Sequence, residues 1–465
     1  MVVRTLVVCV VLMLCVLNSA RAAEEEYPPV PPPEDTSSYG KHFQRSMTLM
    51  ATSTPERRNT VRILYYGQSI MGQQWSEEVD AYLREKYPHC DFVTKNLALG
   101  GFSSQRLVRT MDYDVFPFYP DLLVFHVFGS HIDYETIIRQ VRRRTAAEII
   151  MQSDHANKWP EPKAESIEGQ ESWSAKMNYW HLPGFARKYG CAWQPQRREW
   201  VDYLKAHDLE PEALLKDGVH LNEHGRWLMA ELLKRFMVYL PEEPDDEWRD
   251  LTTTYVVGRD VQWQDGRLRL EFEGNRVVAL AAPGPQGEAR VLIDGKAPSE
   301  FPECYAFTRP SGTAGVGWPA IKRISHQTPL VVEQWTATFH DFNEDQTEFT
   351  FTVEGSVTGP DGEGRAGEKF VSDSGRVVIE PQDWVFEYCK KVSGESTPDG
   401  WQVRWRVEPL FVDTYAPAEV TDPAAENATV LASGLTNGPH TLELVSETGH
   451  APAIQAIRAY KPPLE

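Results

Sequence analysis

Apolar and polar positions follow two different periods along the chain. Between residue 60 and residue 243, continuous apolar runs alternate with stretches in which apolar residues recur every three or four positions. Apolar runs are typical of buried parallel strands, and the second spacing is typical of helices that cover a sheet. The pattern predicts strands at residues 61–66, 92–96, 122–128 and 148–152. Residues 60–243 are therefore predicted to form a three-layer α/β domain with a parallel sheet.

Residues 244–465 have a different texture, in which apolar and polar residues alternate one by one. Proline and an acidic turn stop the preceding helical pattern at residues 241–246. Gly, Asp, Asn and Pro turns then separate the alternating runs, which include residues 267–272, 348–353, 401–407 and 441–445. This pattern predicts an antiparallel β-sandwich or jelly roll. We expect its frame in residues 250–300 and 425–465, with a β-rich insertion at 300–420.

The first 22 residues have the three parts of a secretory signal peptide. Arg4 is followed by an apolar run over residues 6–17 and by the small-x-small sequence of residues 20–22. The run is shorter than the about 20 residues that a spanning helix needs, so no membrane span is predicted. We expect an exported protein, periplasmic, extracellular or at the cell surface, cleaved near Ala22. Residues 23–59, rich in proline and polar residues, are expected to be a spacer.

The charge balance is acidic, with 47 basic and 67 acidic residues and a net charge of −20. Such a balance does not favour binding to nucleic acid or to an acidic membrane surface. It is typical of a soluble protein, and we expect a monomer.

Four cysteines remain after removal of the predicted signal peptide, two in each half of the chain. In an oxidising compartment this predicts the pairs Cys90–Cys191 and Cys304–Cys389, although three connectivities are possible and free buried thiols are the alternative. No C-x-x-C spacing is present, so neither a zinc site nor a redox motif is indicated. We expect no metal and no cofactor.

Two short segments carry candidate chemistry. Asp217 precedes His220 by three residues, so its carboxylate can hold one imidazole nitrogen while the other faces a substrate. The hydroxyl that such a pair needs is best supplied by Ser69, which follows the first predicted strand and enters a predicted helix start. The alternatives are a helix N-cap for the serine and a surface hydrogen-bonded pair for Asp217 and His220.

These segments resemble the sequence blocks of the SGNH (GDSL-type) hydrolase family over about residues 60–240. The family's Gly-Asp-Ser stands here as Gly67-Gln68-Ser69, a variant similar to the Gly-Gln-Ser of carbohydrate acetylesterases in that superfamily. The resemblance implies a flavodoxin-like three-layer fold. It assigns the nucleophile to Ser69, the general base to His220, the orientation of that base to Asp217, and one oxyanion-hole N–H to Gly101.

The third sequence block departs from the family. A Gly-x-Asn is expected after the third strand, whereas the sequence here is Gly129-Ser130-His131. An imidazole N–H can donate the same hydrogen bond as the amide, so the resemblance implies an oxyanion hole made by Ser69, Gly101 and His131. The substitution also fits an altered substrate or a site that has lost activity.

Other histidines and aromatic residues are open to two interpretations. His126 and His131, with Asp133 nearby, suggest a metal site, but a structural histidine suits a buried strand better and no fourth ligand is evident. The connection before Asp217 can form either a platform for sugar rings or a packed core or lid. Its aromatic and imidazole side chains are Trp173, Trp180, His181, Trp193 and Trp200.

The sequence therefore predicts an exported serine esterase that removes a small acyl group, such as acetyl, from a carbohydrate. The choice of substrate class depends on the Gly-Gln-Ser resemblance. A lipid or thioester hydrolase with the same triad is one alternative. A catalytically inactive carbohydrate-binding protein is the other, because His131 replaces the expected Asn.

Overall fold

The computed structural model describes residues 27–159, 172–242, 249–284, 287–417, 419–446 and 451–465. The predicted signal peptide lies outside the described residues, so export stays a prediction. Across the described ranges, no helix combines the length and the apolar character needed to cross a membrane.

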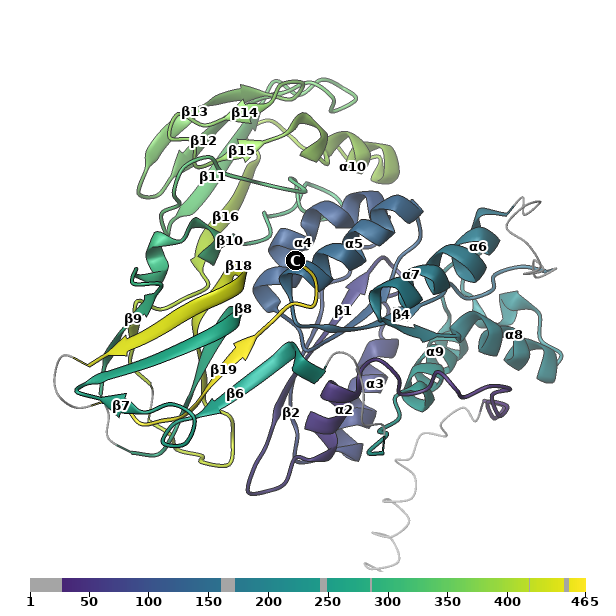
Figure 1. Ribbon diagram of the computed structural model, residues 1–465. Helices are drawn as coiled ribbons and strands as arrows, with labels where there is room; N and C mark the ends of the chain where they lie inside the picture. Colours follow the sequence, from purple (N-terminus) through teal and green to yellow (C-terminus); the bar gives the residue numbers. More distant parts are fainter. Residues whose placement is uncertain (1–26, 160–171, 243–248, 285–286, 418, 447–450) are drawn as a thin grey trace, which may run out of the picture.

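A parallel sheet forms the centre of the first half (Figure 1). Its strand order in the described residues is β2-β1-β3-β4-β5. The strands are β1 (Thr60–Gly67), β2 (Asp91–Asn96), β3 (Leu122–His126), β4 (Glu148–Gln152) and β5 (Ala192–Gln194). The predicted parallel α/β fold is confirmed, whereas β5 is too short to give a recognisable pattern. The order reverses between β1 and β3, and in sheets of this kind ligands bind beyond the carboxyl ends of the strands at such a switch point.

Helices cover both faces of this sheet, as Figure 1 shows. Along β1 the side chains of Ile63 and Tyr65 enter one core, and those of Leu64 and Tyr66 enter the other. The first core is covered by α2 (Gln44–Ala51), α3 (Trp75–Lys86), α8 (Gln196–Ala206) and α9 (Glu223–Phe236). The second is covered by α4 (Ser104–Phe118), α5 (His131–Arg144) and α7 (Leu182–Tyr189), with the short α6 (Trp173–Lys176) and a π-helix (Met177–His181) before α7.

The prediction of an unpacked spacer at residues 23–59 is wrong for its described part. Tyr39 and Phe43 are buried in the first core, and α2 follows them immediately. The proline-rich stretch before them also makes contacts, because prolines lack an N–H but keep a carbonyl acceptor. The carbonyls of Pro28, Pro29 and Pro31 accept hydrogen bonds from Tyr203, His207 and Arg235.

The second half contains two larger antiparallel sheets, so the predicted antiparallel β-rich region is confirmed. A seven-stranded sheet of the described residues comprises β6 (Thr252–Val256), β7 (Trp263–Gln264), β8 (Arg267–Ala281), β9 (Ala289–Ile293), β17 (Thr414–Tyr415), β18 (Ala428–Val445) and β19 (Ile454–Tyr460). A five-stranded sheet comprises β10 (Tyr305–Phe307), β11 (Gln334–His340), β12 (Thr350–Gly355), β13 (Gly359–Arg365) and β16 (Gln402–Pro409). Beside it lie the pair β14 (Phe370–Val371) and β15 (Val378–Ile379) and the helix α10 (Phe386–Ser393).

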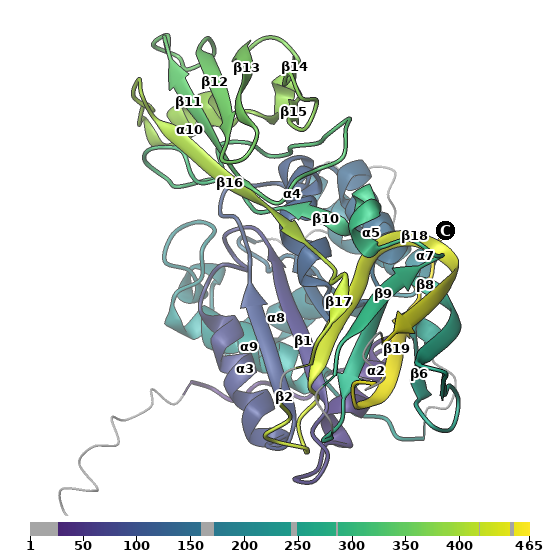
Figure 2. The same cartoon turned by 90° about the vertical axis from the view of Figure 1, so that its left-hand side faces the viewer.

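Each of these two sheets has a hydrophobic core of its own. Figure 2 shows the five-stranded sheet above the seven-stranded one. The seven-stranded sheet is built on the long pair β8 and β18, whose register shifts after Val430 and again after Ser433. Such irregularities bend a strand pair, which lets the sheet curve.

The predicted disulfides are absent, because all four cysteines of the described residues are free and buried. Cys90 precedes β2 at one edge of the parallel sheet, and Cys191 precedes β5 at the opposite edge. Strands lie about 4.8 Å apart, so these edges are separated by roughly 19 Å. A disulfide requires Cα atoms within about 7 Å. Cys304 and Cys389 likewise belong to different cores.

We predict that all four thiols are reduced in the purified chain lacking residues 1–22. Alkylation in denaturant without reductant should modify Cys90, Cys191, Cys304 and Cys389, whereas burial should make their reaction slow in the native protein. Mass spectrometry gives the number of groups added, and a sample reduced beforehand is the control. A lower mass than in that control would contradict the free-thiol arrangement.

Candidate active site

Ser69 lies in a turn directly after β1, at the switch point of the sheet. The prediction that it enters a helix start is wrong, because α3 begins only at Trp75 and its N-cap is Gln74. The N-cap alternative for Ser69 is excluded for the same reason. A Cβ at Gly67 would collide with the carbonyl oxygen of His126 in β3. Glycine therefore permits the close approach of the two strands just before Ser69.

His220 connects Ser69 to Asp217 by hydrogen bonds. Its Nε2 lies 3.0 Å from Ser69 Oγ, and its Nδ1 lies 3.0 Å from Asp217 Oδ2. Asp217 Oδ1 also accepts hydrogen bonds from the backbone N–H groups of His220 and Val219, at 2.7 and 2.9 Å. These two backbone bonds, with the side chain of His220, lower the pKa of the Asp217 carboxyl to about 2. The carboxylate is thus ionised near neutral pH and fixes Nδ1 as the protonated nitrogen, which leaves Nε2 to accept the serine proton.

Three side chains that sequence analysis missed hold the segment between Asp217 and Leu221. Gln73, from the Ser69 turn, accepts a hydrogen bond from the Leu221 N–H at 3.0 Å and donates to its carbonyl at 2.8 Å. Asn157 donates to the carbonyl of Gly218 at 3.1 Å, and His155 Nε2 lies 2.9 Å from the carbonyl of Val219. His155 and Asn157 follow β4, so their contacts to a segment sixty residues away leave no local sequence signal.

Gly101 lies in the turn after β2, beside the serine. It has a φ of +80°, and a Cβ on its neighbour Gly100 would lie 3.6 Å from Ser69 Cβ. In the described part of the chain, the N–H groups of Ser69 and Gly101 donate to no protein acceptor. Unpaired backbone donors in two turns that meet at Ser69 and Gly100 suit the stabilisation of an oxyanion.

His131 is placed differently from the other predicted site residues. It is the first residue of α5, and its ring stacks on His181 with the centroids 4.3 Å apart. The ring of Trp173 lies 5.4 Å from it, and Trp173 Nε1 donates to the carbonyl of Gly129. Among the described residues, His131 forms no hydrogen bond with Ser69 or His220. Its oxyanion role stays a prediction.

The remaining aromatic candidates divide between surface and core. Trp173 and Trp180 are each more than one third exposed, whereas Trp200 is fully buried in the first core and Trp193 packs against the second. Trp173, His131 and His181 form an aromatic cluster at the same edge of the sheet as Gly129, in which the ring of Trp173 is the exposed member.

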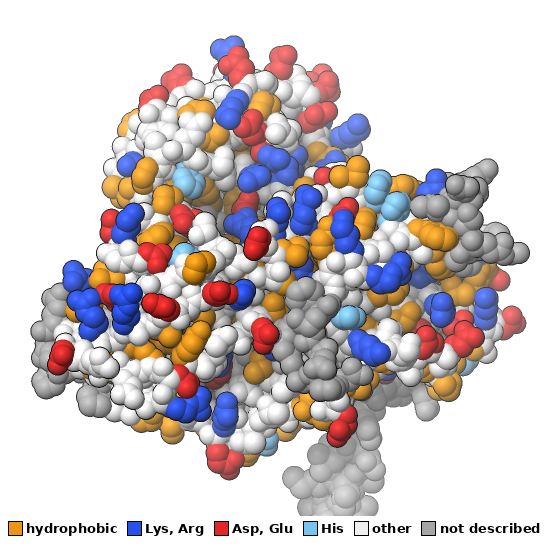
Figure 3. All heavy atoms as spheres, viewed as in Figure 1, with side chains coloured by type: hydrophobic (Ala, Val, Ile, Leu, Met, Phe, Trp, Pro, Cys, Tyr) orange, Lys and Arg blue, Asp and Glu red, His pale blue; other side chains and the backbone are white. Residues whose placement is uncertain are grey.

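His126 is a buried structural residue, with Nε2 3.2 Å from Asp154 Oδ1. Over the described ranges, no group of three or more His, Cys, Asp or Glu side chains is arranged to hold a metal ion. On the face drawn in Figure 3, basic and acidic side chains are interspersed.

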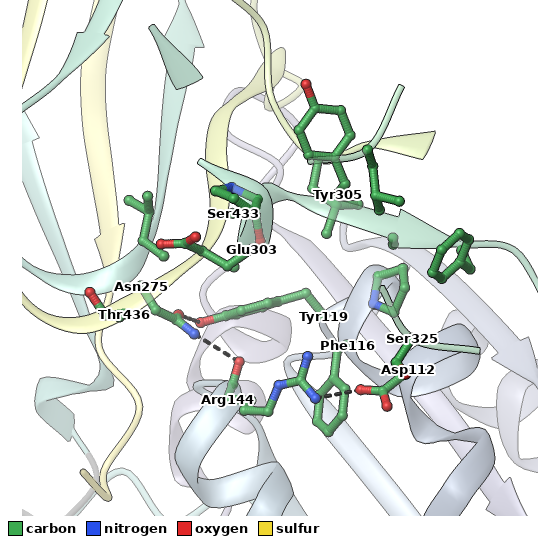
Figure 4. Close-up of a pocket in the computed structure, with 18 of the residues that line it drawn as sticks. Asp112, Phe116, Tyr119, Arg144, Asn275, Glu303, Tyr305, Ser325, Ser433 and Thr436 are labelled. Carbon is green, nitrogen blue, oxygen red and sulfur yellow. Dashed lines mark hydrogen bonds and ion pairs between the residues drawn. The ribbon is translucent and has the colours of Figure 1, made fainter. Parts of the chain in front are cut away.

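A separate cavity of about 590 Å³ lies between α4, α5 and the antiparallel half (Figure 4). Arg144 forms an ion pair with Asp112 in its wall, and Tyr119 donates to Asn275, which in turn donates to the carbonyl of Arg144. None of Ser69, Asp217 and His220 lines this cavity. Some polar groups of its wall are thus paired with one another, whereas the buried Asn437 Oδ1 accepts no hydrogen bond among the described residues.

Comparisons with known proteins give likenesses to solved structures only. No protein-family model matches the sequence, and no curated protein matches it. The acetylxylan esterase Axe2 from Geobacillus stearothermophilus is similar, with 16% identity and a TM-score of 0.34, over 39% of this chain and 95% of that chain.

Two further solved structures are similar. A two-domain esterase (CEX) active on acetylated mannans has 12% identity and a TM-score of 0.34, over 92% of this chain and 97% of that chain. LAE5, an alpha/beta hydrolase enzyme from the metagenome of Lake Arreo, Spain, has 18% identity and a TM-score of 0.33, over 41% of this chain and 99% of that chain. Likenesses of this degree assign no activity to this chain.

We predict that His155 makes the protein sensitive to acid. Burial, with a smaller contribution from His126, lowers the pKa of His155 to about 4, against about 6.5 in an unfolded chain. Between these two pH values the unfolded state binds a proton that the folded state does not, so stability falls as pH falls through this window. The total loss is about 3 kcal/mol.

The variant His155→Gln should flatten this dependence, because glutamine keeps an N–H donor but does not titrate. Urea unfolding between about pH 7 and pH 4 measures the slope. The exposed His89 supplies the control variant His89→Gln. Equal slopes for the wild type and His155→Gln would contradict the prediction.

Proposed function

We propose that the chain is a serine ester hydrolase that removes a small acyl group, acetyl in particular, from a carbohydrate. The observation that carries the proposal is the hydrogen-bonded line from Asp217 through His220 to Ser69. A hydroxyl, a base and an orienting carboxylate in this order are what nucleophilic acyl transfer requires.

In the first half of the reaction, Ser69 Oγ attacks the ester carbonyl carbon while its proton passes to His220 Nε2. The negative charge that develops on the carbonyl oxygen is stabilised by the N–H groups of Ser69 and Gly101, with His131 as the third donor in the proposal. The tetrahedral intermediate collapses, the bond to the alcohol breaks, and His220 gives its proton to the leaving oxygen.

In the second half, water replaces the alcohol. His220 Nε2 takes a proton from the water as its oxygen attacks the acyl-serine carbonyl, and the same donors stabilise the second oxyanion. Collapse releases the carboxylic acid and returns the proton to Ser69 Oγ. No further reactant is needed.

The substrate class is supported by two observations. The sequence Gly67-Gln68-Ser69 is similar to the Gly-Gln-Ser of carbohydrate acetylesterases. The aromatic cluster of Trp173, His131 and His181 beside Gly129 offers flat ring faces of the kind that pack against sugar rings. The signal-like pattern of residues 1–22 supports action outside the cytoplasm, where polymeric carbohydrates are met.

A lipid or thioester hydrolase is the second candidate function. The same three residues serve either reaction, because the mechanism acts on the acyl carbonyl and is indifferent to the alcohol or thiol that leaves. The length of the acyl chain therefore separates the two candidates. A small-acyl esterase loses activity as the chain lengthens, whereas a lipid hydrolase gains it.

We predict that Ser69→Ala lowers the turnover of nitrophenyl acetate by about 10⁴-fold or more, because it removes the hydroxyl that forms the acyl-enzyme in the proposed mechanism. The measurement compares acetyl, butyryl and longer nitrophenyl esters, with acetyl expected to be fastest. Ser356→Ala, at an exposed serine in the antiparallel half, is the matched control and should keep full activity.

Turnover that survives in Ser69→Ala would exclude the serine mechanism. A maximum at long acyl chains would instead favour the lipid or thioester hydrolase. Binding of an acetylated oligosaccharide by a wild-type chain that hydrolyses none of these esters would favour the inactive carbohydrate-binding protein.

A further inference from the structure

Two aromatic side chains from the antiparallel half pack on the turn that carries Gly101. The hydroxyl of Tyr388, on α10, donates a hydrogen bond to the Gly101 carbonyl at 2.8 Å. Trp318 lies against the same glycine, so that a Cβ there would be 2.7 Å from Trp318 Cζ2. The rings of Trp318 and Tyr388 are stacked, with centroids 4.9 Å apart and planes 12° apart.

Neighbouring side chains hold these two rings in place. The guanidinium of Arg106, on α4, lies 3.5 Å from the centre of the Tyr388 ring. Trp318 is buried, and its ring meets that of Phe102 edge-on at 5.5 Å. The two aromatic residues are thus clamped between the antiparallel half and the residues that follow Gly101.

A second contact reaches the other end of the same turn. Arg309, from the antiparallel half, donates to the carbonyl of Leu97 at 3.0 Å. Leu97 follows β2 and precedes Gly101. We call residues 97–101 the oxyanion turn. The antiparallel half binds a backbone carbonyl at each end of it, through Arg309 at Leu97 and through Tyr388 at Gly101.

Ion pairs along α4 connect that helix to the antiparallel half. Arg309 also pairs with the buried Asp114 at 2.8 Å, and Arg109 forms a two-point ion pair with the buried Asp383. A buried carboxylate without its arginine would be left as an uncompensated charge, so each pair favours the one arrangement in which its two partners meet. Because α4 begins just after Gly101, its docking also limits the movement of the turn.

The oxyanion turn needs support of this kind. Gly100 and Gly101 carry no side chain that could lock their conformation, and glycine is the most permissive residue. From the α/β half the turn receives the hydrogen bonds from Leu99 N–H to the Gly67 carbonyl and from Phe102 N–H to the Leu99 carbonyl. Neither bond engages Gly101 itself. Donors that stabilise an oxyanion must be held within about 0.5 Å of the productive position.

We propose that Tyr388 and Trp318 are positioning residues that aim the Gly101 N–H at the oxyanion, so that the antiparallel half completes the active site. The inference rests on the proposed function, because it assigns a purpose to contacts around the proposed oxyanion hole. It makes the antiparallel half a part of the hydrolytic site in addition to any binding role.

The test uses Tyr388→Phe in the full chain, because this change removes one hydroxyl and keeps the ring that stacks on Trp318. Loss of a whole oxyanion donor costs about 10²- to 10³-fold in kcat, so a misdirected donor should cost roughly 10-fold. The KM for nitrophenyl acetate should stay within about twofold, since the contact acts on the transition state. Inhibition by phenylboronic acid, whose tetrahedral adduct on a serine places an oxygen in the hole, should weaken in parallel with kcat.

Tyr305→Phe is the matched control. Its hydroxyl donates to the carbonyl of Ser299 at 3.0 Å, also within the antiparallel half, so the chemical change is the same at a site away from Gly101. The control should keep the wild-type kcat and boronic acid inhibition. Urea unfolding of both variants separates positioning from stability, and Trp318→Phe, which keeps a smaller ring beside Gly101, is a second variant with a lower expected kcat.

The outcomes separate this inference from the proposed function. Wild-type turnover that depends on Ser69, with kcat unchanged in both Tyr388→Phe and Trp318→Phe, would overturn the positioning role alone. A fall in kcat that merely follows a loss of stability, with boronic acid inhibition unchanged, would also overturn it. Absence of any Ser69-dependent turnover in the wild type would overturn the proposed function and the positioning role together.

Discussion

The parallel pairing of β1 with β3 is the constraint on which the candidate site depends. At its carboxyl end Gly67 lies against the His126 carbonyl with no room for a side chain, and the chain leaves directly into the Ser69 turn. Because the strand order reverses here, the connections from the two strands diverge and leave an accessible crevice. The turn after β2 enters that crevice from the other side of β1 and brings Gly100, the neighbour of Gly101, next to the serine.

The imidazole of His220 reaches this crevice on the segment of residues 217–221, which is fixed by side chains from other parts of the chain. Asp217 accepts hydrogen bonds from the backbone N–H groups of Val219 and His220 within this segment. Gln73 connects the segment to the turn that carries Ser69. His155 binds the segment from the loop after β4, and burial keeps that imidazole neutral at ordinary pH, with its pKa lowered to about 4. An exposed Asp–His pair thereby acquires a fixed geometry without being buried itself.

The antiparallel half contacts α4, the helix that follows the Gly101 turn of the same crevice. Buried ion pairs join that helix to the antiparallel region, and the contacts of Tyr388 and Trp318 extend the junction to Gly101. Both halves therefore contribute contacts that position the glycine turn at Gly101. The separate cavity in Figure 4 lies along the same junction but is lined by none of the three proposed catalytic residues.

The sequence by itself determined the four longer parallel strands, the change to antiparallel texture, and the identity of Ser69, Asp217 and His220 as candidates. These depend on local periodicity and on short motifs, whose physical basis lies within a few residues. Only the tertiary structure decided the packing of residues 27–59, the reduced cysteines, the short β5, and the roles of Gln73, His155 and Tyr388. Each of these depends on groups far apart in the chain, and such contacts leave no periodic trace because the residues meet only after the layers have packed.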